Sequence, residues 1–313
     1  MIVLKFLDGD IKMTKKYAAV YGPLIERLHA EAEKGHKKSL DSIKAVKTKL
    51  HQMYGAYTQD NAHKKAAAII SKHDDACTSS NDLSDCNKSS ELLLSLHAST
   101  KERLPYYPEF YEFILSRIGP VESVLDIGCG YNPFSIPVMQ AVCEKLFHTG
   151  HAPTAHAGSM APAVNLKAYY AYDIDTRVAD LINRYFSCLS LPPLAECADL
   201  AVHIPAHQAD LALMCKLIPV LEAQAPGSGY KLARELNVRY LLVTYPLKSL
   251  SGREKGMAKH YAATFEKAMA DGEFGKFSIV GHGVVGTEIL YLLAANQTNP
   301  SLVSIPHTSP LVR

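Results

Sequence analysis

Residues 124–134, with the sequence Val-Leu-Asp-Ile-Gly-Cys-Gly-Tyr-Asn-Pro-Phe, constrain the fold of this chain more than any other stretch. A short apolar run reaches Asp126, Gly128 and Gly130 follow, and a helical pattern resumes after Pro133. This order predicts a strand, a tight loop and the start of a helix. Glycine lets a ligand approach the backbone because it has no Cβ, and Asp126 can either order the loop or face a cationic ligand group.

Two common kinds of nucleotide site do not fit this loop. The dinucleotide pattern G-x-G-x-x-G needs a third glycine where this chain has Pro133, and the chain contains no phosphate-binding G-x-x-x-x-G-K-[ST] sequence. The shorter pattern D-x-G-x-G is typical of S-adenosylmethionine (SAM) methyltransferases, in which the loop lies along the methionine part of SAM. The loop by itself leaves a SAM site and an ordinary strand, turn and helix as alternatives.

Composition narrows the class of protein. The chain has 313 residues, 48% of them apolar, which is enough for one or two domains with a full core. Its seven cysteines are odd in number, scattered and without a C-x-x-C pair, so they predict reduced thiols rather than a disulfide framework or a zinc site. No apolar run is long enough for a signal peptide or a membrane span. We therefore expect a cytoplasmic protein that binds no metal and no membrane.

A helical pattern runs between residues 13 and 70, before the first strand that the sequence predicts. Residues 1–65 contain 13 Lys or Arg against 7 Asp or Glu. This surplus, with Lys44 and Lys47 off the apolar stripe, suits a phosphate-rich partner, and a solvated helix face explains it equally well. The apolar stripe recurs at intervals of three and four and consists of Ile43, Val46, Leu50, Met53 and Tyr57.

The polar composition of residues 71–90, rich in Ser, Asp and Asn, predicts an exposed linker and a domain boundary. Beyond it, strand and helix patterns alternate, which predicts an α/β fold with a mainly parallel sheet. We therefore divide the chain into an all-helical extension with its linker (1–90), an α/β domain (91–296) and a mobile tail (297–313). The strands expected after the glycine loop are Ala168 to Tyr172, Leu211 to Met214, Tyr240 to Thr244, Phe277 to Val280 and Glu288 to Leu293. The last two should form an antiparallel pair at the sheet edge, joined by the glycine-rich residues 282–286.

One histidine-rich stretch interrupts the alternation of strands and helices. His148, His151 and His156 lie among Gly, Pro and Ala residues, and no carboxylate or cysteine accompanies them on a regular element. The pattern therefore favours a surface loop over a metal site.

Acidic residues follow the second and third expected strands, where a nucleotide site needs them. Asp173 ends an apolar run, so its carboxylate can accept both ribose hydroxyls of a bound nucleoside. Asp175, two residues further on, suits the N-cap of the next helix. Asp199 follows the third strand region, where it can either meet an adenine amino group or serve only the local fold.

Residues 210–219 occupy the place where methyltransferases that modify nucleic-acid bases carry their signatures. The segment has no Asn/Asp-Pro-Pro-Tyr/Phe sequence for holding an exocyclic amine, and Cys215 lacks the Pro-Cys or Thr-Cys setting of a nucleophile that adds to cytosine. We interpret Cys215 as a small buried residue. The absence of such a base or nucleophile motif favours an acceptor whose lone pair is free at neutral pH.

Four segments carry distinctive motifs: Leu-Ser-Leu-His-Ala-Ser-Thr-Lys-Glu-Arg-Leu (94–104), Leu-Asp-Ile-Gly-Cys-Gly-Tyr-Asn-Pro (125–133), Cys-Lys-Leu-Ile-Pro-Val-Leu (215–221) and Pro-Leu-Lys-Ser-Leu-Ser-Gly-Arg-Glu-Lys-Gly-Met (246–257). Together they resemble the aminoglycoside-resistance 16S rRNA methyltransferases, and among these the group that methylates N7 of guanine 1405 in the decoding site. The resemblance runs from about Tyr17 to Leu293. Residues 71–90 and 142–167 depart from the family's pattern because both stretches are longer than usual.

The resemblance implies a class I, Rossmann-like SAM-dependent methyltransferase with a helical extension that docks on the small ribosomal subunit. Arg103 would hold the SAM carboxylate through two parallel hydrogen bonds, and Tyr57 would cover the site from the extension. Asp173 would bind the ribose and Asp199 the adenine. The implied cofactor-binding set is Tyr57, His97, Ala98, Ser99, Arg103, Asp126, Gly128, Gly130, Asp173, Asp199, Leu200, Cys215 and Gln224.

Guanine N7 is unprotonated at neutral pH, so the implied methyl transfer needs no general base and depends on alignment, with Lys216 and Arg253 as positioning residues. N7 faces the deep, narrow major groove of paired RNA, so we expect the target nucleotide to be extruded. The implied partner is 16S rRNA in the 30S subunit, bound by a monomer, with no role for DNA. The implied RNA-binding residues are Lys44, Lys47, Lys216, Lys248, Arg253, Lys255 and Lys259.

Two other functions stay open at this point. One is a SAM-dependent methyltransferase that acts on another rRNA base or on a small molecule. The other, from a different class, is a SAM-binding, ribosome-associated protein without turnover. Incubation with labelled SAM and alternative acceptors would separate the three.

Overall fold

A seven-stranded sheet forms the centre of the protein in a computed structural model. The structure describes residues 2–6, 9–13, 17–35, 39–55, 57, 61–79, 83–147, 166–248 and 256–296. The strand order is β5-β4-β3-β6-β7-β9-β8. The first five strands in this order, β5, β4, β3, β6 and β7, pair in parallel with their neighbours. β9 pairs antiparallel with both β7 and β8. The strands are β3 (Ser123–Ile127), β4 (Ala168–Asp173), β5 (Ala195–Cys197), β6 (Ala209–Cys215), β7 (Val238–Pro246), β8 (Phe277–Val285) and β9 (Glu288–Ala295). The predicted α/β class, the mainly parallel sheet and the antiparallel pair at its edge are confirmed.

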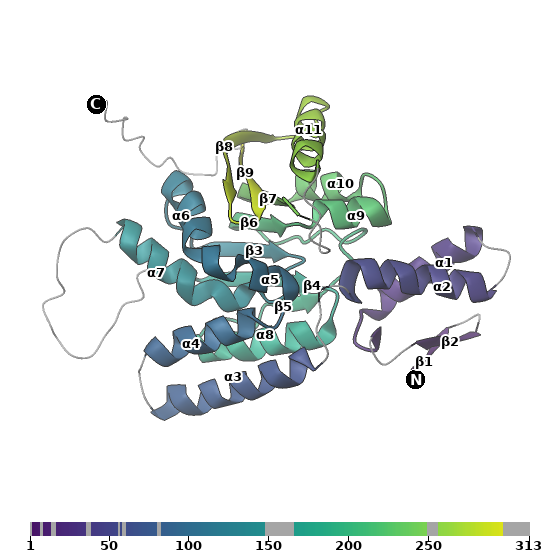
Figure 1. The fold of residues 1–313 in the computed structure, drawn as a ribbon, viewed down its shortest axis with the longest axis horizontal. Helices are drawn as coiled ribbons and strands as arrows, with labels where there is room; N and C mark the ends of the chain where they lie inside the picture. The colour runs from purple at the N-terminus through teal and green to yellow at the C-terminus, as the bar shows by residue number, and fades with distance from the viewer. Residues whose placement is uncertain are drawn as a thin grey trace, which may run out of the picture.

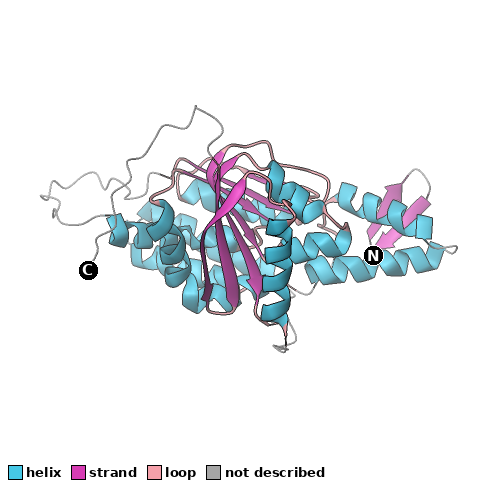
Figure 2. Cartoon of the chain, turned by 90° about the horizontal axis from the view of Figure 1, so that it is seen from above, coloured by secondary structure: helices cyan, strands magenta, loops and turns pink. Residues whose placement is uncertain are grey.

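Helices cover both faces of this sheet (Figures 1 and 2). Alternate residues of a strand point to opposite faces, so Leu211 and Leu213 of β6 pack in one apolar core while Ala212 and Met214 pack in the other. The first core is covered by α3 (Ala62–Ser79), α4 (Leu83–Leu94), α6 (Tyr107–Ile118), α7 (Ile136–Phe147) and α8 (Thr176–Cys188), and the second by α9 (Ile218–Gln224), α10 (Ser228–Glu235) and α11 (Met257–Ala270).

The start of the extension has a small apolar core of its own. It contains α1 (Gly22–Gly35), α2 (Ser39–Leu50) and the single turn η2 (His51–Gly55), and Figure 1 shows α1 and α2 beside β4. Val46 and Leu50 of the predicted apolar stripe are buried in this core, with Ile174 of the α/β part packed against it. The backbone also joins the two parts, because Tyr21 N donates to Ile174 O at 2.8 Å and Thr176 N donates to Ala19 O at 2.9 Å. These contacts hold the extension at the carboxyl edge of the sheet.

The prediction of an all-helical extension is wrong at its beginning. β1 (Ile2–Phe6) and β2 (Gly9–Met13) form an antiparallel pair in which Ile2 lies opposite Met13. The β-branched residues at 2 and 3 favour extended backbone. The run is too short to give a clear period of two, and for this reason the sequence pattern did not reveal it.

The prediction of an exposed linker over residues 71–90 is also wrong for the residues that the structure describes. α3 continues to Ser79, and α4 begins at Leu83. Two serine hydroxyl groups in this stretch donate hydrogen bonds to backbone carbonyls: Ser71 Oγ donates to Ala67 O, and the buried Ser90 Oγ donates to Phe134 O. Both helices contribute to the core of the sheet, through Ile70 and Leu93 among others. The division of the chain into three parts stays a prediction.

Of the glycine-rich residues 282–286 predicted to link the last two strands, 282–285 lie instead inside β8 and Gly286 lies in the turn. A Cβ on Gly281 would stand 2.7 Å from Cδ of Arg117, and one on Gly283 would stand 3.0 Å from a ring carbon of Phe113. Both neighbours belong to α6, so the missing side chains allow this helix to pack closely on the edge strand. The turn itself falls between Val285 and Glu288.

Candidate cofactor and substrate site

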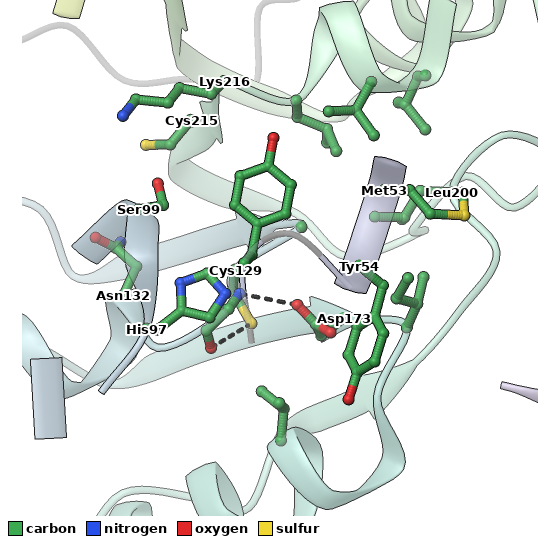
Figure 3. Close-up of a pocket in the computed structure, with 18 of the residues that line it drawn as sticks. Met53, Tyr54, His97, Ser99, Cys129, Asn132, Asp173, Leu200, Cys215 and Lys216 are labelled. Atoms are coloured by element: carbon green, nitrogen blue, oxygen red, sulfur yellow. Dashed lines mark hydrogen bonds between the residues drawn. The ribbon is translucent and has the colours of Figure 1, made fainter. Parts of the chain in front are cut away.

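A cavity opens at the carboxyl ends of β3, β4 and β6, the edge at which parallel sheets bind ligands. The short helix α5 (Ala98–Arg103) contributes to one wall, and Met53 and Tyr54 of η2 contribute to another. Figure 3 shows Lys216 and Cys215 at the top of the view and Asp173 below them, across the cavity. Of the residues implied to bind the cofactor, all line this cavity except Ala98 and Asp126.

The glycine loop forms the floor of the cavity. Gly128 and Gly130 have φ values of +67° and +50°, a left-handed conformation that side chains disfavour. A Cβ on Gly130 would also stand 2.9 Å from Cε1 of His97. The sequence therefore needs glycine at 130 for two reasons, the backbone conformation and the closeness of the His97 ring.

Asp126 orders the loop and lies outside the cavity lining. Its side chain is buried and accepts hydrogen bonds from Asn132 Nδ2 at 2.8 Å and from Tyr169 Oη at 2.7 Å. Burial raises the pKa of Asp126 to about 6, because the charged form loses hydration. Of the two roles that the sequence left open for Asp126, the structure favours the ordering of the loop.

Arg103 enters the cavity from α5 with part of its hydrogen-bonding capacity already used. Its Nε and Nη2 donate to the two carboxylate oxygens of Glu288, each at 2.9 Å, and Nη1 donates to Asn132 Oδ1 at 2.9 Å. A guanidinium has five N–H groups. One N–H on each terminal nitrogen is therefore left for a ligand carboxylate. Burial opposes ionisation of Glu288, but the charges of Arg103 and Lys216 hold its pKa below the usual value.

His97 lies between two aromatic rings, with its plane 11° from that of Tyr57 and 25° from that of Tyr131. Burial, together with the nearby charge of Arg103, lowers the pKa of His97 to about 4, so the ring is neutral at physiological pH. Its Nδ1 is buried and has no hydrogen-bond partner among the described residues. Ala98 supports this wall indirectly, because its backbone N donates to Tyr57 O at 3.1 Å.

Two acidic residues, Asp173 at the end of β4 and Asp175 just beyond it, have different roles. Asp173 lines the cavity and accepts hydrogen bonds from Gly130 N at 2.9 Å and Asp175 N at 3.0 Å. Burial raises its pKa to about 6. Asp175 caps α8 by accepting from Arg177 N at 2.9 Å, as the sequence predicted, and it also accepts from Tyr54 Oη of the extension at 2.5 Å.

Asp199 lines the cavity but is held by a residue that the sequence did not single out. Arg27 of α1 donates from Nε to Asp199 Oδ2 at 2.5 Å and from Nη2 to Asp199 Oδ1 at 3.0 Å. The same Nη2 lies 3.4 Å from Gln224 Oε1, another lining residue. Leu200 adds an apolar surface next to Asp199. The extension therefore contacts Asp199, which the resemblance assigns to adenine, and the lining residue Gln224.

The end of β6 supplies a thiol and an ammonium group to the cavity. Burial raises the pKa of Cys215 to about 12, so the thiol stays protonated at neutral pH and is a poor nucleophile. Lys216 has a φ of +57°, and its backbone N donates to Thr244 Oγ1 at 3.1 Å. Its side chain is only 9% exposed, and Nζ lies 2.7 Å from Glu102 Oε2 and 3.5 Å from Glu288 Oε1.

A second cavity of about 370 Å³ adjoins the first and shares lining residues with it. Among the residues implied to bind RNA, Lys216 and Lys248 line this second cavity. Lys44 and Lys259 are exposed and Lys47 is half-buried, and none of the three lines either cavity. Arg253 and Lys255 lie outside the described residues, as do His148, His151, His156 and the tail 297–313.

Within the described residues the protein shows neither a metal-binding cluster nor a membrane-spanning helix. This part of the chain contains no cluster of three or more His, Cys, Asp or Glu side chains that could hold a metal ion. Nor does any of the helices within it combine the length and the apolar character needed to cross a bilayer.

The sheet order, the glycine loop beneath the cavity and the carboxylate at the end of β4 define a Rossmann-like, SAM-dependent methyltransferase fold. The family described as "Ribosomal RNA methyltransferase (FmrO)" matches residues 13–154 and 153–279. The chain belongs to this family of ribosomal RNA methyltransferases.

Individual relatives extend over nearly the whole chain. A 16S rRNA (guanine(1405)-N(7))-methyltransferase of Serratia marcescens is 32% identical over 92% of this chain and 96% of its own length. A protein of the same name from Micromonospora rosea is 27% identical over 92% of this chain and 95% of its own length. Among solved structures, the 16S rRNA methyltransferase RmtF in complex with S-adenosyl-L-homocysteine is similar with a TM-score of 0.71, at 30% identity over 90% of this chain and 94% of RmtF.

Proposed function

We propose that this chain is a 16S rRNA (guanine(1405)-N(7))-methyltransferase that uses SAM and acts on the 30S subunit in the cytoplasm as a monomer. The observation that carries the proposal is the similarity of nearly the whole chain to relatives with this name. Aminoglycoside resistance is the expected consequence, as in the family that the motifs resemble.

The residues around the first cavity fit SAM. The two remaining N–H groups of Arg103 suit a carboxylate, and the unpartnered Nδ1 of His97 needs a polar group from a ligand. Asp173 presents a carboxylate, the group that accepts ribose hydroxyls in nucleotide sites of this fold. We therefore assign the cofactor roles to the lining residues named above.

SAM supplies an activated methyl group that guanine N7 can attack directly. The protein then needs only to align the two molecules and exclude water. Lys216 lies where both cavities meet and can position the target base, while Cys215 remains a neutral wall residue because its pKa is about 12. The described cavity walls thus suit a reaction without proton abstraction or covalent addition.

Labelled SAM, incubated with 30S subunits, naked 16S rRNA and free nucleosides, tests the proposal. We expect label in the 30S subunit alone, and mapping of the product should locate N7-methylguanine at one decoding-site position. Label in nucleosides or at another base would support a different acceptor. Binding of SAM without transfer to any of the three acceptors would support a non-catalytic ribosome-associated protein.

The affinity for the cofactor should depend on pH through Asp173. Its ionised carboxylate is the better acceptor for ribose hydroxyls, and its pKa of about 6 means that the ionised form is lost as the pH falls through 6. We expect S-adenosyl-L-homocysteine to bind about tenfold more weakly at pH 5 than at pH 7, as calorimetric titration would measure. Asp173→Asn should bind weakly at both pH values. Equal affinity of the unaltered protein at pH 5 and pH 7 would contradict this role.

The role of Arg253 in RNA binding can be tested separately from cofactor binding. Because the resemblance assigns it to target positioning, Arg253→Ala should leave the affinity for S-adenosyl-L-homocysteine within about twofold and abolish 30S methylation. Arg234→Ala, which removes an exposed arginine on α10, is the matched control and should methylate normally. Full methylation by Arg253→Ala would exclude the assigned role.

A further inference from the structure

The second cavity lies beside the cofactor cavity, and the two cavities share part of their walls. Six residues line both: Met53, Tyr57, Ser99, Lys216, Val220 and Gln224. The rest of its wall includes Pro246, Met257 and Tyr261, whose flat or apolar surfaces can cover the face of a base. Its position and lining therefore suit an extruded nucleotide.

One charged pair stands in this wall. Lys216 Nζ and Glu102 Oε2 are 2.7 Å apart, and the Glu102 side chain is 41% exposed. Glu102 lines only the second cavity, whereas Lys216 lines both. Oε1 of Glu102 accepts no hydrogen bond from any described residue, so it is open to a ligand.

The order of these groups matches the edge of one base. Guanine carries N2–H and N1–H donors, then the O6 acceptor, then N7. Glu102 would accept from N1–H and N2–H, and the adjacent Lys216 ammonium would donate to O6. N7 lies beyond O6, on the adjoining Hoogsteen edge of the base, and Lys216 is the member of this pair that also lines the cofactor cavity. Adenine would place an amino group against the ammonium and an unprotonated N1 against the carboxylate.

We propose that Glu102 is a specificity-determining residue that reads the N1–H and N2–H donors of the target guanine while Lys216 holds O6. This inference rests on the proposed function and adds to it the means by which guanine is distinguished from other bases. Charge-assisted hydrogen bonds in a partly dehydrated cavity are strong enough for such discrimination.

Inosine, which lacks the 2-amino group of guanine but keeps O6, N1–H and N7, isolates the contact to Glu102. We would reconstitute 30S subunits with 16S rRNA that carries guanosine or inosine at the target position. The unaltered protein should have a kcat/KM at least about tenfold lower for inosine, because one charge-assisted hydrogen bond is lost. In Glu102→Ala, kcat/KM for guanine should fall at least about tenfold, and the ratio of guanine to inosine should approach one.

A matched control and two further readouts separate this role from a structural one. Glu109→Gln removes an exposed carboxylate of α6 outside both cavities and should keep the original ratio. Glu102→Ala should keep its affinity for S-adenosyl-L-homocysteine within about twofold, and its melting temperature should stay unchanged because Glu102 is partly exposed. A Glu102→Ala protein that still prefers guanine to inosine would overturn the assignment of Glu102 alone. Methylation of a base other than guanine by the unaltered protein would overturn the proposed function as well.

Discussion

Replacing Glu288 with leucine is expected to destabilise the protein by about 3 to 5 kcal/mol and to reduce cofactor binding at least a hundredfold. Glu288 is 2% exposed and Arg103 is 3% exposed, so the substitution would leave a buried guanidinium without its partner. Arg103 would also lose the two hydrogen bonds that orient it in the cavity. Urea denaturation measures the stability, and calorimetric titration with S-adenosyl-L-homocysteine measures the affinity.

The double variant Arg103→Met with Glu288→Leu separates the two effects. Because both charges are removed together, most of the lost stability should return. Cofactor affinity should stay low, since no guanidinium remains to hold the carboxylate. A double variant as unstable as Glu288→Leu alone would show that the buried charge is not the cause. A double variant that binds normally would exclude Arg103 as the carboxylate ligand.

Replacing Arg27 with methionine is expected to weaken the attachment of α1 to the cofactor cavity by about 2 to 5 kcal/mol. Asp199 would lose both hydrogen bonds from Arg27, and its side chain is only 6% exposed. We expect faster hydrogen exchange in α1 and an affinity for S-adenosyl-L-homocysteine at least about tenfold lower. Hydrogen-exchange mass spectrometry and calorimetry would measure the two effects.

Glu31→Gln is the control for Arg27. Glu31 also accepts a hydrogen bond from Arg27, at 2.7 Å, but lies on the same helix and outside both cavities. Its replacement should change neither hydrogen exchange in α1 nor cofactor affinity by more than about twofold, because exposed ion pairs contribute little. Unchanged cofactor affinity in Arg27→Met would show that the extension does not support the site through this contact.

The sequence revealed those parts of the site that depend on local pattern. The strand, glycine loop and helix at 123–136 could be predicted because the apolar run and two glycines lie close together in the chain. Asp173 could be predicted from its position at the end of an apolar strand. The role of Arg103 was predicted only from the family resemblance, since nothing in its local sequence pattern indicates a ligand-binding residue.

The missed residues form contacts over long separations in sequence. Arg27 and Asp199 are 172 positions apart, and Arg103 and Glu288 are 185 positions apart, so no local pattern relates them. One signal was available for Glu288, because it begins an otherwise apolar strand and a buried carboxylate needs a partner. The helices at 71–90 were missed because a polar composition says little about the backbone when the hydroxyl groups find carbonyl partners: Ser71 Oγ donates to Ala67 O on its own helix, and the buried Ser90 Oγ donates to the distant Phe134 O.

The common wall between the two cavities also matters for inhibition. A compound that joins an adenosine-like group to a purine through a short bridge near Lys216 would occupy both cavities at once. Such a compound loses translational freedom only once, so its affinity would exceed that of either half by a factor set by the length and stiffness of the bridge. Because one half imitates the cofactor and the other the acceptor, selectivity over other SAM-dependent enzymes would come mainly from the half beside Glu102.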